Sequence, residues 1–157
     1  MARPDRHGRP EDGLTAVAEH DLRAQGWQPR QTPGFMATAG PLWTRREGDG
    51  WAYGVWVQAP HLNPAGLMHG GALLTLVDHA LSTVAWQASE RTPCLTLQLD
   101  THFMAAVLPD TFVEVRAQLS HRTRGLLFLR GRASVGEQTV LQAQAVLKIA
   151  GPSRPDV

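Results

Sequence analysis

Residues 63–80, NPAGLMHGGALLTLVDHA, decide how the rest of this chain is interpreted. Apolar residues recur there at helical spacing, which predicts a buried helix from His69 to about Ala88. Such a helix opens with two glycines, although glycine costs roughly 1 kcal/mol relative to alanine inside a helix. It also holds a carboxylate, Asp78, and an unpaired buried carboxylate is far more costly. Both features need a structural or a functional explanation.

The predicted helix has an apolar stripe, and alternating segments follow it. The stripe consists of Leu73, Leu74, Val77, Leu81 and Val84. Four later segments alternate apolar and polar residues, which is typical of strands with one face on a core. Their apolar positions are Leu95, Leu97 and Leu99; Val113, Val115, Ala117 and Leu119; Leu127, Leu129, Ala133 and Val135; and Leu141, Ala143, Ala145, Leu147 and Ile149. Residues 42–46 and 51–57 predict two further strands, joined by a hairpin at 47-EGDG-50.

Strands that follow one another without helices between them predict an antiparallel sheet, because each parallel pair needs a crossover, usually a helix. One long helix is available to cover that sheet. The expected class is α+β, with about six strands curved round the central helix and a short amphipathic helix at residues 11–25 outside. We expect a flexible tail at residues 1–10, one domain at 11–151 and a flexible end at 152–157.

The composition restricts the function classes. The chain has 157 residues, which suits one domain, and its 15 basic and 14 acidic residues give no strong attraction to nucleic acid or an anionic membrane. Cys94 stands alone, and we expect no signal peptide and no membrane span, hence a cytoplasmic protein. His61, His69 and His79 lack the spacing of metal ligands, so no metal site is expected.

The two glycines at the helix start have two possible explanations. The first N–H groups of a helix have no internal partner, and with the helix dipole they attract an anion or a developing oxyanion. Gly70 and Gly71 carry no Cβ and would let a ligand approach that end closely. Alternatively, they allow the helix end to pack tightly against the sheet. The pattern leaves both explanations open.

The position of Asp78 constrains any active site. With Thr75, His79 and Ser82 it forms a polar stripe, and by pattern alone such a stripe is more often a solvated face. Gly70 and Asp78 are eight residues apart, which separates them by ~12 Å along one helix. A base must lie within hydrogen-bond reach of the proton it takes, so if both residues act on one substrate, a second copy supplies one of them. That would be a symmetric dimer with the site at its interface.

The spacing of Asn63, His69-Gly70-Gly71 and Asp78, followed by 94-CLTLQLDTHFMAAV-107, resembles the hotdog-fold acyl-CoA thioesterases of the phenylacetate-degradation type. The similarity covers residues 51–149. It implies a hotdog fold, hydrolysis of acyl-CoA without a cofactor, and a homodimer or a dimer of dimers.

The resemblance also implies roles for single residues. Asp78 would be the general base or the nucleophile, and the Gly70 N–H would hold the thioester oxygen. Asn63 and His69 match residues that position water and the helix start, and Thr96 falls where a human member of the family has a serine. From side-chain chemistry, Arg122 or Arg124 suits the phosphates of CoA. Two alternatives stay open: a non-catalytic acyl-CoA-binding protein, and an acyl-thioester hydratase or dehydratase.

Overall fold

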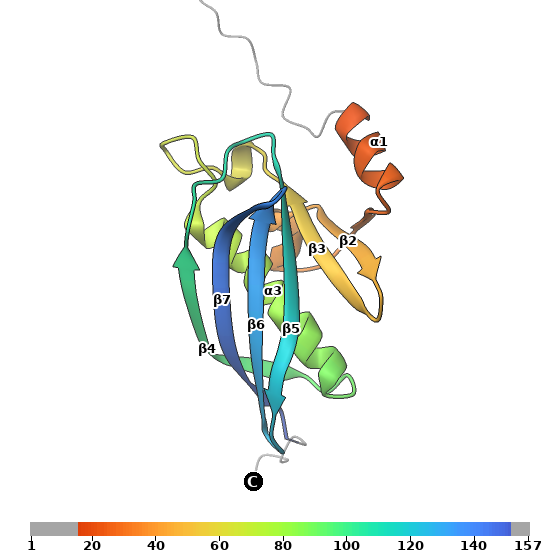
Figure 1. Cartoon of the computed structure of the whole chain (residues 1–157), viewed down its shortest axis with the longest axis vertical. Coiled ribbons are helices and arrows are strands. Elements are labelled where there is room, and N and C mark those ends of the chain that lie inside the picture. The colour runs from red at the N-terminus through yellow and green to blue at the C-terminus, as the bar shows by residue number, and fades with distance from the viewer. Residues whose placement is uncertain (1–15, 152–157) are drawn as a thin grey trace, which may run out of the picture.

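The computed structural model describes residues 16–151, in which one antiparallel sheet curves round a long helix (Figure 1). The helices are α1 (Ala16–Ala24), α2 (Phe35–Ala39) and α3 (Gly70–Ala88), with a 3-10 turn η1 (Ala59–His61). The strands are β1 (Gln28–Arg30), β2 (Leu42–Glu47), β3 (Gly50–Trp56), β4 (Cys94–Phe103), β5 (Phe112–Arg122), β6 (Leu126–Val135) and β7 (Gln138–Ile149). Their order in the sheet is β1-β2-β3-β5-β6-β7-β4.

The predicted α+β architecture is therefore confirmed, with one strand more than expected. The additional strand, β1, has three residues with Pro29 in the middle, so it is too short to show a period of two. It pairs with β2 at the edge of the sheet. The predicted ends at 1–10 and 152–157, and the first residues of the predicted N-terminal helix, lie outside the described residues.

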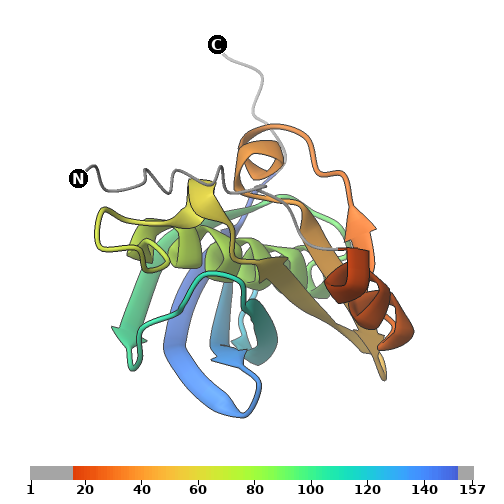
Figure 2. The same ribbon diagram turned by 90° about the horizontal axis from the view of Figure 1, so that it is seen from above.

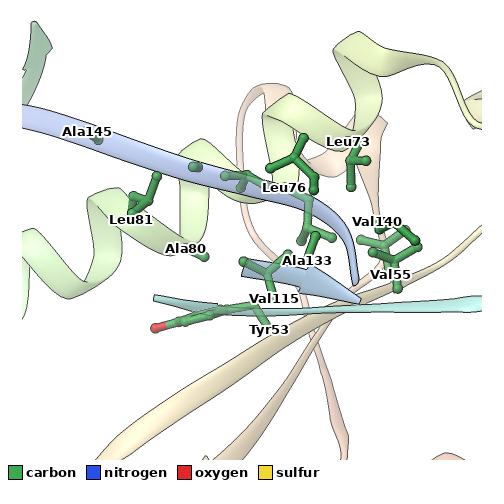
Figure 3. Close-up of a cluster of buried hydrophobic side chains, with 14 of the residues drawn as sticks. Tyr53, Val55, Leu73, Leu76, Ala80, Leu81, Val115, Ala133, Val140 and Ala145 are labelled. Atoms are coloured by element: carbon green, nitrogen blue, oxygen red, sulfur yellow. The ribbon is translucent and has the colours of Figure 1, made fainter. Parts of the chain in front are cut away.

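Helix α3 packs on one face of the sheet and forms the main core with it (Figure 3). Its buried residues are Leu73, Leu76, Val77, Ala80, Leu81 and Ala85. The buried face thus includes two alanines that the predicted stripe lacked, while Leu74 and Val84 of that stripe are half-buried. Gly131 of β6 lies beneath Leu81, because a Cβ added there would stand 3.4 Å from a Leu81 methyl carbon. Small residues on both elements let the helix lie close to the sheet.

One predicted core face is wrong in part, because Leu99 of β4 packs against the main core but the other two leucines of that face do not. Leu95 and Leu97 of β4 are 60% and 58% exposed. In the pairing of β4 with β7, Thr96 lies opposite Leu147, Gln98 lies opposite Val146, and Leu97 is skipped. An extra residue in a strand reverses which side chains face the core. Thr96 therefore faces α3, which is the side that simple alternation assigns to Leu95 and Leu97. Leu119, near a second skipped residue in β5, is also exposed, at 38%.

A smaller cluster on the other face of the sheet holds α1 in place. Figure 2 shows α1 outside the curved sheet, near β2 and β3. It consists of Leu22, Trp27, Trp43 and Ala52, with Trp56 and Phe112 packed against it. Alternation along β2 explains the two clusters, since Leu42 belongs to the main core and Trp43 to this one. The predicted position of the N-terminal helix outside the sheet is confirmed.

Candidate active site

A buried histidine, His61, holds the loop that leads into α3. Its Nδ1 accepts the N–H of Gln58 at 3.0 Å, and its Nε2 lies 3.1 Å from the carbonyl oxygen of Ala39. Burial lowers the pKa of His61, which favours the neutral ring that can accept at Nδ1 and donate from Nε2. Its carbonyl oxygen accepts the N–H of His69 at 2.7 Å. His61 thus links α2 and η1 to the residue before α3.

Asn63 shapes the turn between η1 and α3. Its side-chain oxygen accepts the N–H groups of Ala65, at 2.9 Å, and Leu67, at 3.2 Å. Gly66 completes the turn with a φ of 77°, in the left-handed region that favours glycine. The oxygen of Asn63 is therefore engaged within the turn, and the residue also lines the hollow described below.

The N-terminus of α3 leaves one amide free. His69 is the N-cap, and its Nδ1 accepts the N–H of Gly71 at 2.8 Å. Its carbonyl oxygen accepts the N–H groups of Ala72 and Leu73 at 2.9 and 3.1 Å. Within residues 16–151, no atom accepts the N–H of Gly70. The helix start therefore presents a single unpaired donor, together with the positive end of the helix dipole.

That amide borders a hollow of about 370 Å³ between the start of α3 and the segment after β4. The hollow is lined by Asn63, Leu67, Met68, Gly70, Leu73, Phe103, Met104, Ala105, Ala106 and Val107. The sequence assigned no role in the site to Phe103, at the end of β4, or to residues 104–107, which have neither a helical nor a strand period. The only available signal was their place at the end of the motif that carries the family resemblance.

Asp78 and Thr96 meet halfway along α3. The hydroxyl of Thr96 donates to Oδ1 of Asp78 at 3.0 Å, and Asp78 is half-buried. The skipped residue in β4 makes this contact possible, because it turns Thr96 toward the helix. The other carboxylate oxygen, Oδ2, accepts no hydrogen bond within the described part of the chain. One oxygen of Asp78 is thus oriented and the other is available.

The adjacent residue, His79, faces a different element. Its ring lies edge-on to Tyr53 of β3, with 6.1 Å between ring centres. Burial lowers the pKa of His79, and the nearby carboxylate of Asp78 opposes that shift. His79 is therefore a packing residue of the sheet-facing side of α3.

The predicted site residues thus fall into three places in one chain. Asn63, His69, Gly70 and Gly71 lie together at the start of α3, and Asp78 with Thr96 lies ~12 Å further along it. Arg122 donates from Nη1 to the carbonyl oxygen of Ala88 at 2.6 Å, at the opposite end of the helix. Arg124 lies exposed in the turn between β5 and β6. A single chain does not bring these groups together.

Other features of the surface contain none of the predicted site residues. A hollow of about 920 Å³ lies on the sheet face away from α3 and is lined by polar side chains such as Arg116, Arg130 and Gln142. Residues 16–151 contain no group of three His, Cys, Asp or Glu side chains that could hold a metal ion. Among the described helices, none has the length and apolar character needed to cross a bilayer.

Comparison with known proteins adds a family and a fold. Residues 65–142 match the family model described as Thioesterase superfamily, whereas no curated protein matches the chain. A Bacillus halodurans protein solved with CoA superimposes with a TM-score of 0.70 at 18% identity, over 89% of this chain and 92% of its own. Zebrafish thioesterase superfamily member 2 superimposes with a TM-score of 0.68 at 19% identity, over 88% of this chain and 100% of its own. A Ralstonia eutropha protein described as phenylacetic acid degradation-related superimposes with a TM-score of 0.59 at 21% identity, over 90% of this chain and 95% of its own.

Proposed function

Because the chain belongs to the thioesterase superfamily and has the hotdog fold, we propose that it hydrolyses an acyl-CoA to a carboxylic acid and CoA at a site shared by two copies. The observation that carries this proposal is the unpaired N–H of Gly70 in the wall of an apolar hollow. The B. halodurans protein of the same fold was solved with CoA, which supports CoA as the carrier of the acyl group.

Gly70 would stabilise the charge that develops during attack on the thioester. The carbonyl oxygen becomes negative as the tetrahedral intermediate forms, and a fixed donor 2.7–3.1 Å away stabilises it. His69 leaves Gly70 as that donor because it already accepts the next N–H. Removal of one such donor in acyl-transfer enzymes costs about 10²–10³ in kcat.

Asp78 would activate the attacking group. In one route Oδ2 takes a proton from water, whose oxygen forms the new bond to carbon, and the C–S bond then breaks as the CoA sulfur takes up a proton. In the other route the carboxylate itself attacks the carbonyl carbon, the C–S bond breaks and CoA leaves, and water then hydrolyses the resulting anhydride to the acid and free Asp78. Thr96 supports either route, because its hydroxyl fixes the other oxygen of Asp78.

Two copies are needed to bring these groups to one carbonyl. The ~12 Å between Gly70 and Asp78 along α3 is too long for both to reach the same atom. Strand β4 is one edge of the sheet and carries the exposed Leu95 and Leu97. Exposed apolar edge strands tend to pair with another chain. A two-fold dimer through β4 would place Asp78 of one copy opposite Gly70 of the other.

The remaining predicted residues would have supporting roles in a cytoplasmic enzyme without a cofactor. Asn63 and His69 would fix the turn and the helix cap that aim the Gly70 amide. Gly71, lacking a Cβ, leaves room for the His69 ring, whose Nδ1 would stand 3.1 Å from an added Cβ. Arg124, and the part of Arg122 not bound to Ala88, would meet the phosphates of CoA.

Thiol release from a panel of acyl-CoAs tests the activity. Wild-type protein should release free thiol, and Asp78→Asn, which keeps the size of the side chain, should lower kcat by about 10²–10⁴. Absence of thiol release would remove the hydrolase assignment. A change in double-bond absorbance would indicate a hydratase instead, and saturable binding without reaction would indicate a binding protein.

Mixed dimers test the shared site. Gly70→Pro removes the N–H at a helix position that tolerates proline, and Gly70→Ala is its control because it keeps the N–H. Unfolding and refolding a mixture of inactive Gly70→Pro and Asp78→Asn chains should restore about a quarter of wild-type activity, since half the dimers then hold one intact site. If each chain carried a complete site of its own, the mixture would stay inactive.

A further inference from the structure

We propose that Phe103 determines which acyl groups are accepted, and that the hollow beside Gly70 takes an apolar acyl group of short or medium length. This inference rests on the proposed function, because it places the thioester carbonyl at the Gly70 amide. It concerns the acyl part of the substrate, which neither the family nor the motif specifies.

The ring of Phe103 lies directly beside the proposed oxyanion donor. A Cβ added to Gly70 would stand 3.3 Å from Cζ and 3.4 Å from Cε1 of Phe103. Phe103 pairs with the buried Leu141 of β7 and therefore points to the same side of the sheet as α3. A carbonyl oxygen bound to the Gly70 N–H would bring its acyl carbons against this ring.

The hollow offers an apolar surface to whatever is attached to that carbonyl. Leu73, Met68 and Val107 are buried in its wall, at 3%, 8% and 4% exposure. Asn63 is the one residue with a polar side chain among those that line it, and its oxygen already accepts two backbone N–H groups. An acyl group with a charge would lose hydration there without an oppositely charged partner, since none of the lining side chains is charged.

Size follows from the volume and from the position of the ring. The part of the pocket that one copy forms is about 370 Å³, near the lower end of the 300–1,000 Å³ typical of ligand pockets. Phe103 is 52% exposed and Met104 57%, so both present free apolar surface to a ligand. Phe103 thus bounds the space available beyond the carbonyl, and the size of its side chain sets the length of the acyl group that fits.

Replacement of Phe103 by a smaller and by a larger side chain tests this inference. The kcat/KM should be measured for straight-chain acyl-CoAs of increasing length with wild type, Phe103→Ala and Phe103→Trp. Since one methylene in an apolar pocket changes selectivity by about tenfold or more, Phe103→Ala should raise the long-to-short ratio of kcat/KM at least about tenfold. Phe103→Trp should lower the same ratio. Phe35→Ala is the matched control, because Phe35 is an exposed aromatic outside the hollow, and its ratio should stay at the wild-type value.

The outcomes separate this inference from the proposed function. If wild type releases no thiol from any acyl-CoA, both fail. If wild type is active but both Phe103 variants keep its length profile, the inference alone is overturned. Solution mass should be measured in parallel, because a Phe103 variant that becomes monomeric would assign the ring to a contact between copies and would also overturn it.

Discussion

Asp78 has a defined orientation because one neighbouring hydroxyl holds it. Thr96 donates to Oδ1, which limits rotation of the carboxylate and leaves Oδ2 free to act. Hydrogen bonds to charged groups contribute about 1.5–3 kcal/mol, with less expected where water reaches the pair. A threonine at this position retains the donor that a serine would provide.

Removing that donor should lower turnover without unfolding the protein. Thr96→Val keeps the shape of the side chain and loses the hydroxyl, so kcat should fall about tenfold, as expected for a loss near 1.4 kcal/mol. Thr96→Ser keeps the hydroxyl and should retain most of the activity. Steady-state kinetics on both variants decides the matter: equal activity of Thr96→Val and wild type would show that Thr96 plays no part in the reaction.

The residues of the site were partly predictable from the sequence. His69, Gly70 and Asp78 share one helix, so their spacing alone fixed their relative positions. The contact of Arg122 with Ala88 depends on where separate segments fold back, and the sequence carried no sign of it. The bonds of Asn63 are local to its own turn, which the sequence 63-NPAG-66 favours.

Among the elements, the β2–β3 hairpin is tied to β5 by charged side chains. Glu47 at the end of β2 accepts from Nε and Nη2 of Arg116 at 2.7 Å each, and from Arg45 at 2.6 Å. The hydrogen bond from Arg116, together with Arg45, lowers the pKa of Glu47 from 4.5 to about 2, against the opposing effect of burial.

This shift predicts a specific dependence of stability on pH. A carboxylate whose pKa is lower in the folded state stabilises the fold above its unfolded pKa, near 4.5, and loses that contribution as pH falls to about 2. Wild type should therefore lose more unfolding free energy than Glu47→Gln between these pH values, measured by urea unfolding. The control Glu137→Gln, at a residue without an ion pair in the described chain, should follow wild type. If the unfolding free energies of wild type and Glu47→Gln fell in parallel as the pH is lowered, the stabilising role of the Glu47 ion pairs would be contradicted.

Gly54 makes room for the packing between β3 and the cluster under α1. A Cβ added to Gly54 would overlap the ring of Phe112, which packs edge-on to Trp27 at 4.8 Å between centres. Gly54→Ala should lower the unfolding free energy by about 1–3 kcal/mol, because the ring has to shift in a packed cluster. In the same strand, a Cβ on Gly50 would meet nothing closer than 3.7 Å, so Gly50→Ala should change stability by no more than about 0.5 kcal/mol. Equal losses for the two variants would remove the steric explanation.

For the whole molecule, the exposed edge at β4 decides whether a complete site can form. Leu95→Lys and Leu97→Lys place charges on this edge and should shift the solution mass from dimer to monomer, with loss of hydrolysis. Leu119→Lys is the control, since Leu119 is an exposed leucine on β5, away from that edge. A monomeric Leu97→Lys protein that retained wild-type activity would rule out the shared site.

The sequence by itself determined the antiparallel sheet, the central helix and the separation of Gly70 from Asp78, because periodicity and rise per residue are local properties of the backbone. Only the tertiary structure decided that β4 skips Leu97, since an extra residue in a strand is visible only against its partner. That single skipped residue turns Thr96 toward Asp78 and leaves two leucines exposed. Likewise, the hollow beside Gly70 exists because residues 103–107, distant in sequence, fold against the start of α3.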